Sequence, residues 1–95
     1  MVVIGLKQIE RFLESHPECK QEVAEWVREI ESSTFAKPQD LRDRYPSCKV
    51  LDGRVVVFKV RGNKYRLSAQ VAYNTQVVVV LALETHAEYD RRTLR

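Results

Sequence analysis

The sequence contains little of several residues on which other protein classes depend. Its 95 residues include two cysteines and three glycines, so neither a disulfide-stapled secreted domain nor a glycine-rich phosphate loop is expected. Cys19 and Cys48 are far apart and form no CxxC pair, which favours reduced thiols and a cytoplasmic protein. No apolar run reaches the roughly 18 residues of a membrane-spanning helix. Residues 1–6 are apolar but lack the basic start and cleavage site of a signal peptide, so we expect a buried strand there.

The charges are unevenly divided along the chain. The formal net charge is +3, from 16 lysines and arginines against 13 aspartates and glutamates. Residues 1–46 contain nine acidic and seven basic side chains, whereas residues 47–95 contain four acidic and nine basic ones. The cationic character therefore belongs to the second half, where it would attract a polyanion such as nucleic acid.

The first half has the pattern of helices. A short strand over Val2–Ile4 leads into a helix with apolar residues at helical spacing, and Pro17 is suited to open a second helix. In that second helix apolar side chains recur at i, i+4, i+7, i+8 and i+11, counted from Cys19, which is the pattern of one packed face. Pro38 is placed to start a short third helix over residues 39–44.

The second half has the period of β-strands. Valine, phenylalanine and tyrosine are frequent there, and the turn pairs Gly62-Asn63 and Asn74-Thr75 separate the apolar stretches. A further short strand precedes a turn at Asp52-Gly53. The strands are expected at residues 49–51, 54–60, 64–73 and 76–83.

Helices followed by consecutive strands predict an α+β fold. We expect one domain over residues 1–95, in which the N-terminal helices pack on one face of a twisted antiparallel sheet.

Four cations are expected on one face of the hairpin around Gly62-Asn63. If these two residues form the loop, Lys59 faces Arg66 and Arg61 faces Lys64. All four then point away from the apolar face that packs on the helices. Like charges opposite each other destabilise a sheet by a few tenths to about 1 kcal/mol per pair, whereas a phosphate backbone would reward them. A solvated face whose long side chains splay apart is the alternative interpretation.

A second hairpin brings the C-terminal segment to these cations. With Asn74-Thr75 as a two-residue loop, Arg66 lies opposite Leu83, and the chain leaves the sheet after Leu83. In a helical turn His86 and Tyr89, three residues apart, lie on one side. We therefore expect them beside the cationic patch.

These groups suit the cleavage of RNA by its own 2′-hydroxyl. Such cleavage needs an acceptor for the hydroxyl proton, cations for the charge on the phosphoryl oxygens and a proton donor for the departing 5′-oxygen. Arg66 is suited to bidentate contact with phosphate. His86 can give or take a proton near neutrality, and Tyr89 can donate one or stack on a base. Glu88 is a weaker candidate for the base.

Each candidate also has a purely structural interpretation. An exposed histidine often caps a carbonyl group, and Tyr89 would equally well cover the edge of the core. His16 is interpreted as a helix-boundary residue. A metal site from His86, Glu88 and Asp90 lacks a second histidine or a cysteine at ligand spacing, so no metal or other cofactor is predicted.

Two stretches of the chain resemble a known family. Residues 56–67, VVFKVRGNKYRL, and residues 85–90, THAEYD, are similar to the two signature blocks of HigB-like toxins of the RelE superfamily. The short first strand, the paired helices ending near Trp26 and the segment 40–46 are similar as well. The resemblance covers nearly the whole chain and is more specific than a lone short motif.

The resemblance implies a compact RelE-like fold and a metal-independent endoribonuclease that cleaves mRNA, often on the ribosome, and so inhibits translation. It also implies a HigA-like helix-turn-helix antitoxin as partner. The toxin would bind operator DNA only through this antitoxin. The site would combine basic strand residues with the C-terminal histidine and tyrosine. The implied catalytic residues are Lys64, Arg66, His86 and Tyr89. From the distribution of cations we further expect RNA-binding residues at Lys59, Arg61, Asn63, Arg91 and Arg92.

Two residues depart from the family pattern. Lys59 stands where relatives often have asparagine, and it strengthens the cationic patch. Glu84 stands where relatives often have glycine, and it puts a negative charge beside His86. The alternatives to an enzyme are a non-catalytic module that binds RNA or the ribosome, and a basic face that chiefly docks an acidic segment of the antitoxin.

Overall fold

The computed structural model of the chain describes residues 1–51, 54–62 and 64–93, and the side chains as far as Arg91. The turn predicted at Asp52-Gly53 therefore lies outside the described residues. Within them the elements are β1 (Val2–Ile4), α1 (Leu6–Ser15), a 3-10 helix η1 (Pro17–Cys19), α2 (Lys20–Glu31), α3 (Pro38–Arg44), β2 (Lys49–Leu51), β3 (Val55–Val60), β4 (Tyr65–Ala72), β5 (Val77–Thr85) and α4 (His86–Thr93).

The helices begin where the sequence predicts them. Pro17 and Pro38 each occupy the first position of a helix, where proline costs no hydrogen bond and its fixed φ already suits the helix. In α2 the predicted stripe packs against the sheet, because Val23, Trp26 and Ile30 are all buried.

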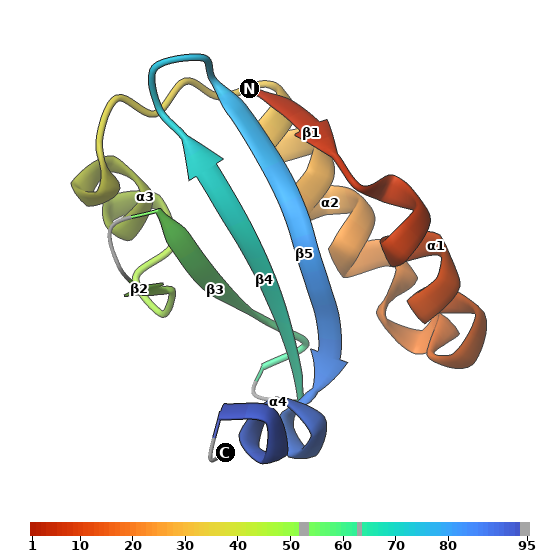
Figure 1. Cartoon of the computed structure of the whole chain (residues 1–95). Helices are drawn as coiled ribbons and strands as arrows, with labels where there is room; N and C mark the ends of the chain where they lie inside the picture. The colour runs from red at the N-terminus through yellow and green to blue at the C-terminus, as the bar shows by residue number, and fades with distance from the viewer. Residues whose placement is uncertain (52–53, 63, 94–95) are drawn as a thin grey trace.

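The five strands form one mixed sheet in the order β1-β5-β4-β3-β2. Strands β2 to β5 pair antiparallel as predicted, whereas β1 pairs parallel with β5, with Val2 opposite Val77. Figure 1 shows α1 and α2 side by side behind one face of the curved sheet, with α4 across one end of β4 and β5. The α+β class and the helix layer are thus confirmed, and the parallel β1 makes the sheet mixed.

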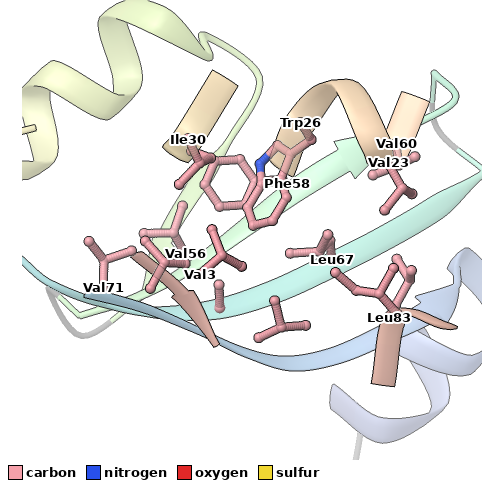
Figure 2. Close-up of a cluster of buried hydrophobic side chains, with 14 of the residues drawn as sticks. Val3, Val23, Trp26, Ile30, Val56, Phe58, Val60, Leu67, Val71 and Leu83 are labelled. Atoms are coloured by element: carbon pink, nitrogen blue, oxygen red, sulfur yellow. The ribbon is translucent and has the colours of Figure 1, made fainter. Parts of the chain in front are cut away.

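The core lies between this sheet face and the two helices. Trp26 of α2 meets Phe58 of β3 edge to face, with ring centroids 5.2 Å apart, and Leu67 and Val56 are completely buried. Figure 2 shows these side chains pointing toward one another from the helix and the strands. The alternation of side chains along the strands sends the neighbouring residues to the opposite side, which we call the open face. It carries Val57, Lys59, Arg66, Ser68 and Glu84.

No helix in the described part of the chain is long and apolar enough to cross a membrane.

Gly5 makes the turn from β1 into α1 possible. Its φ of +97° lies in the left-handed region, which side chains other than glycine rarely adopt. A Cβ built on Gly5 would also lie 2.9 Å from the carbonyl oxygen of Val80, so α1 crosses directly over β5 without room for a methyl group.

Replacing Gly5 with alanine should therefore destabilise the fold by about 2 kcal/mol or more, from the backbone conformation and the clash together. Gly62→Ala is the matched control, because Gly62 has φ +67° and a methyl group added there would meet no atom within 4 Å. Only the backbone cost, about 1 kcal/mol, is expected there. The free energy of unfolding in urea measures both, and equal losses would show that the contact with Val80 does not matter.

Candidate active site

The β3–β4 hairpin has the predicted register. Val60 pairs with Tyr65, Lys59 with Arg66 and Phe58 with Leu67. Lys59 and Arg66 therefore share the open face as two cations directly opposite each other. Lys59 is exposed, whereas Arg66 is only 8% exposed, so the guanidinium is held in place within the face and is not a loose surface charge.

The β4–β5 register follows the prediction next to the turn and differs from it toward the other end of the two strands. Ala72 pairs with Val77 as predicted, but the ladder shifts between Ser68 and Ala69, where β5 has one extra residue. Arg66 consequently faces Glu84, not Leu83. The bulge keeps Leu83 on the buried face opposite Leu67, and it brings a carboxylate into register with the arginine. Glu84 thus lies across from the candidate phosphate-binding group.

A capping box joins β5 to α4. The backbone N–H of Thr85 donates to Glu88 Oε1 at 2.9 Å, and the N–H of Glu88 donates to Thr85 Oγ1 at 3.1 Å. This reciprocal pair satisfies two amide groups that a helix start leaves without partners. The chain therefore stays in the sheet two residues longer than predicted and enters a helix directly at His86. Glu88, the weaker candidate for the base, is committed to the cap.

The start of α4 brings the candidate residues together. The N–H of His86 donates to the carbonyl oxygen of Lys64 at 2.8 Å, so the helix begins against the start of β4. One turn later the ring of Tyr89 lies over Arg66, whose guanidinium carbon is 5.9 Å from the ring centroid. Helical spacing places His86 and Tyr89 at neighbouring positions on α4. Residues about 20 positions apart in the sequence thus meet at one end of the sheet.

Asp90 orients the histidine through a contact that the sequence analysis did not predict. His86 Nδ1 lies 2.7 Å from Asp90 Oδ2, and both side chains are partly exposed. A ring that donates from Nδ1 to a carboxylate keeps Nε2 as the nitrogen that can exchange a proton with a substrate. The i,i+4 spacing of these residues on a helix was the signal that would have found the pair.

Arg61 does not lie on the open face, where the sequence predicted it. Its φ is +52°, outside the strand, so the alternation of β3 no longer decides its direction. The guanidinium reaches toward the helices, donates to the carbonyl oxygen of Glu18 at 2.7 Å and lies 3.9 Å from a carboxylate oxygen of Glu22. Its predicted place on the open face is wrong, and its role in RNA binding stays a prediction.

Tyr65 anchors the strand that carries Arg66. Its hydroxyl donates to Glu18 at the start of the helix layer, and this hydrogen bond, together with burial, raises the pKa of Tyr65 to about 12. His16 stacks on Phe12, with ring centroids 4.4 Å apart, and lies beside Glu18. His16 is therefore the helix-boundary residue that the sequence indicated. The anchoring of Tyr65 on one face fixes Arg66 on the other.

The remaining predicted RNA-binding residues are placed only in part. Lys64 is exposed in the hairpin turn and Arg91 is exposed on α4. Asn63 and the side chain of Arg92 lie outside the described residues. Among the residues that the structure describes, no group of three histidine, cysteine, aspartate or glutamate side chains is arranged to hold a metal ion.

Because the cap fixes the start of α4, Thr85→Ala should loosen the helix. Loss of an N-cap hydroxyl costs about 1 kcal/mol, which we expect as faster hydrogen exchange of the α4 amides while the core amides keep their protection. Thr34→Ala removes a hydroxyl from an exposed loop residue and serves as the control. Unchanged exchange in α4 after Thr85→Ala would contradict the capping role.

The same cap should weaken in acid. The hydrogen bond from the backbone of Thr85 is the main cause that lowers the pKa of Glu88 below its ordinary value of 4.5. A carboxylate with a lowered folded-state pKa stabilises the fold fully above its unfolded pKa, and this contribution is lost as the pH falls through the folded value. An NMR titration of the Glu88 carboxyl carbon should therefore give a midpoint below 4.5, with α4 exchange accelerating over the same range. A midpoint at or above that ordinary value would show that the bond is absent in solution.

Comparison with known proteins agrees with this geometry. Residues 19–92 match the model of the HigB toxin family, described as the RelE-like toxic component of a toxin-antitoxin system. The chain is 33% identical over 93 residues to the mRNA interferase toxin HigB of Escherichia coli K12, covering 95% of this chain and 88% of that protein. The mRNA interferases HigB of Escherichia coli O157:H7 and of Shigella flexneri match with the same identity and coverage.

The matched region includes the hairpin, the shifted β4–β5 ladder and most of α4, all of which build the candidate site. The chain belongs to the HigB family of RelE-like toxins of toxin-antitoxin systems.

Proposed function

We propose that this chain is an endoribonuclease that cleaves mRNA without a metal ion, most effectively on the ribosome, and thereby inhibits translation. The observation that carries the proposal is the meeting of two segments: α4 starts against Lys64 through the backbone of His86 and covers Arg66 with Tyr89. All four predicted catalytic residues belong to this junction. The three relatives named above are mRNA interferases, which supports the same substrate here.

The reaction would run by attack of the RNA 2′-hydroxyl on the adjacent phosphorus. The hydroxyl proton passes to a base, the 2′-oxygen–phosphorus bond forms, the bond to the 5′-oxygen breaks, and that oxygen takes up a proton. The products are a 2′,3′-cyclic phosphate and a free 5′-hydroxyl. His86, oriented by Asp90, would exchange a proton through Nε2, while Arg66 and Lys64 would balance the charge that builds on the phosphoryl oxygens.

Family membership implies an antitoxin as partner. We propose that it is a HigA-like helix-turn-helix protein and that the chain reaches operator DNA only through it. A second function for the open face, docking of an acidic antitoxin segment, has the pair Lys59 and Arg66 in its favour, since like charges on facing strands favour an anionic partner of either kind.

The test is cleavage of a reporter mRNA in a cell-free translation reaction, with the RNA alone in EDTA in parallel. His86→Ala should reduce the cleavage rate by about 10²- to 10⁴-fold, and Arg66→Ala by about 10²- to 10³-fold. Arg28→Ala and Arg42→Ala are the matched controls, because these exposed arginines belong to α2 and α3 and not to the α4 junction. Their cleavage should be unchanged.

If the parent cleaves nothing but still binds ribosomes or RNA, the chain is a binding module and not an enzyme. Cleavage of free RNA at the same rate as in the translation reaction would leave the chemistry in place and overturn the preference for the ribosome. Cleavage that survives both Arg66→Ala and His86→Ala would move the active site away from α4.

A further inference from the structure

A second pocket, of about 200 Å³, lies between α2, the end of β3 and the segment that follows α3. Aromatic rings and carboxylates make up most of its lining, namely Trp26, Tyr45, Phe58, Glu22, Glu25 and Glu29. Sites for small molecules usually measure roughly 300 to 1,000 Å³. This pocket therefore has the size for a single side chain and not for a cofactor.

The aromatic rings of the pocket pack against one another. Trp26 and Tyr45 both meet Phe58 edge to face, with centroids 5.2 Å and 5.3 Å from that of Phe58. Figure 2 shows the indole of Trp26 beside Phe58. The faces of tryptophan and tyrosine rings attract cations, most often the guanidinium of arginine. The apolar part of the pocket thus favours a flat cation.

The carboxylates of the pocket come from one face of α2, at positions i, i+3 and i+7. Two of the three already have a cation nearby. Glu29 accepts a hydrogen bond from Arg44, and Glu22 lies 3.9 Å from the guanidinium of Arg61. The third carboxylate, Glu25, has a different environment.

Glu25 is exposed and accepts a hydrogen bond from the uncharged amide of Gln21 at 3.3 Å. Lys59 also lines the pocket. Among the residues that the structure describes, neither Glu25 nor Lys59 takes part in an ion pair. The pocket therefore has one carboxylate that can accept from a further cation.

The indole N–H of Trp26 lacks a hydrogen-bond partner. Trp26 is 6% exposed and lines the pocket, and its nitrogen is buried without an acceptor among the described residues. A buried tryptophan N–H usually finds an acceptor. Because an indole nitrogen can only donate, the group that completes it must carry an acceptor such as a peptide carbonyl oxygen.

The pocket also adjoins a free edge of the sheet. Strand β2 pairs with β3 only over Val55–Val57, so in the described part of the chain Phe58–Val60 has no neighbouring strand on this side. These three residues line the pocket. The main-chain groups of an edge strand are available to an extended segment of another protein, so a peptide main chain can approach the pocket here.

We propose that this pocket binds an arginine residue of a partner protein. The guanidinium donates to Glu25 and lies against the rings of Trp26 and Tyr45, while a main-chain carbonyl oxygen of the same segment accepts from the indole N–H. Arginine fits better than lysine, because its planar guanidinium stacks on aromatic rings and can bind a carboxylate through two N–H groups. None of these three residues belongs to the junction of Arg66 and His86, so the inference stands whether or not the chain cleaves RNA.

Short peptides test the pocket directly. Trp26 is the only tryptophan of the chain, so its indole N–H signal in an NMR titration reports this pocket. The probes are acetyl-Gly-Arg-Gly-amide and the same peptide with citrulline, which has the shape of arginine without its charge. The arginine peptide should bind about tenfold more tightly. Agmatine, which has the guanidinium but no peptide carbonyl group, should shift the indole signal less than the arginine peptide does.

Glu25→Gln should weaken binding of the arginine peptide about fivefold to tenfold and leave the citrulline peptide unaffected, because only the charged group depends on the carboxylate. Glu14→Gln changes an exposed glutamate of α1 that does not line the pocket and should leave both affinities as in the parent. Equal binding of the arginine and citrulline peptides would overturn the inference. Tighter binding of acetyl-Gly-Glu-Gly-amide would also overturn it, because Lys59 would then decide what the pocket accepts.

The cleavage assay separates this inference from the proposed function. Glu25→Gln should cleave mRNA as the parent does, and Arg66→Ala should bind the arginine peptide as the parent does. Selective binding of the arginine peptide without cleavage of RNA would refute the nuclease and keep the pocket. Cleavage without selective binding would refute the pocket and keep the nuclease.

Discussion

The extra residue Leu81 in β5 sets the alignment of everything that follows it in the chain. A sheet has a side-chain period of two, so one inserted residue reverses which side chains face the core. Beyond the bulge, Leu83 returns to the buried side and Glu84 comes opposite Arg66. Thr85 then reaches the end of the strand, where its backbone and hydroxyl can close the cap on α4. The position of the histidine and the tyrosine therefore depends on a single irregularity in one ladder.

The sequence predicted the helices and strands better than the contacts between them. Helix starts at Pro17 and Pro38 and the register of the β3–β4 hairpin follow from local chemistry, and both are confirmed. The parallel pairing of β1 depends on contacts between distant parts of the chain, which no local pattern encodes. The spacing of His86 and Tyr89 predicted that these residues share one side of a helical turn. The bulge that makes Glu84, and not Leu83, the partner of Arg66 could not be predicted, because the alternation of this valine-rich strand does not reveal it. Arg61 was misplaced because the alternation was continued one residue beyond the strand.

The candidate site joins a rigid part to a more lightly held one. Arg66 belongs to a central strand and is nearly covered, and Tyr65 before it is tied to the helix layer. The histidine belongs to α4, which is attached through the backbone of Lys64 and the capping box. In the proposed reaction, charge stabilisation would thus depend on the sheet, and proton transfer would depend on a helix whose attachment is local. Substitutions in the capping box would therefore affect the proposed proton transfer more than they affect the stability of the core.

The parallel pairing of β1 with β5 determines when the sheet can form during synthesis. Val2 and Val77 are partners although they are 75 positions apart in the chain. At roughly 5 to 20 residues per second, a ribosome needs about 4 to 15 seconds between making one and making the other. Throughout that interval the growing chain can form helices but cannot close its sheet, since long-range pairing must wait for the later strand. The segment that carries the histidine is made later still, so the candidate site comes together only after the sheet can close.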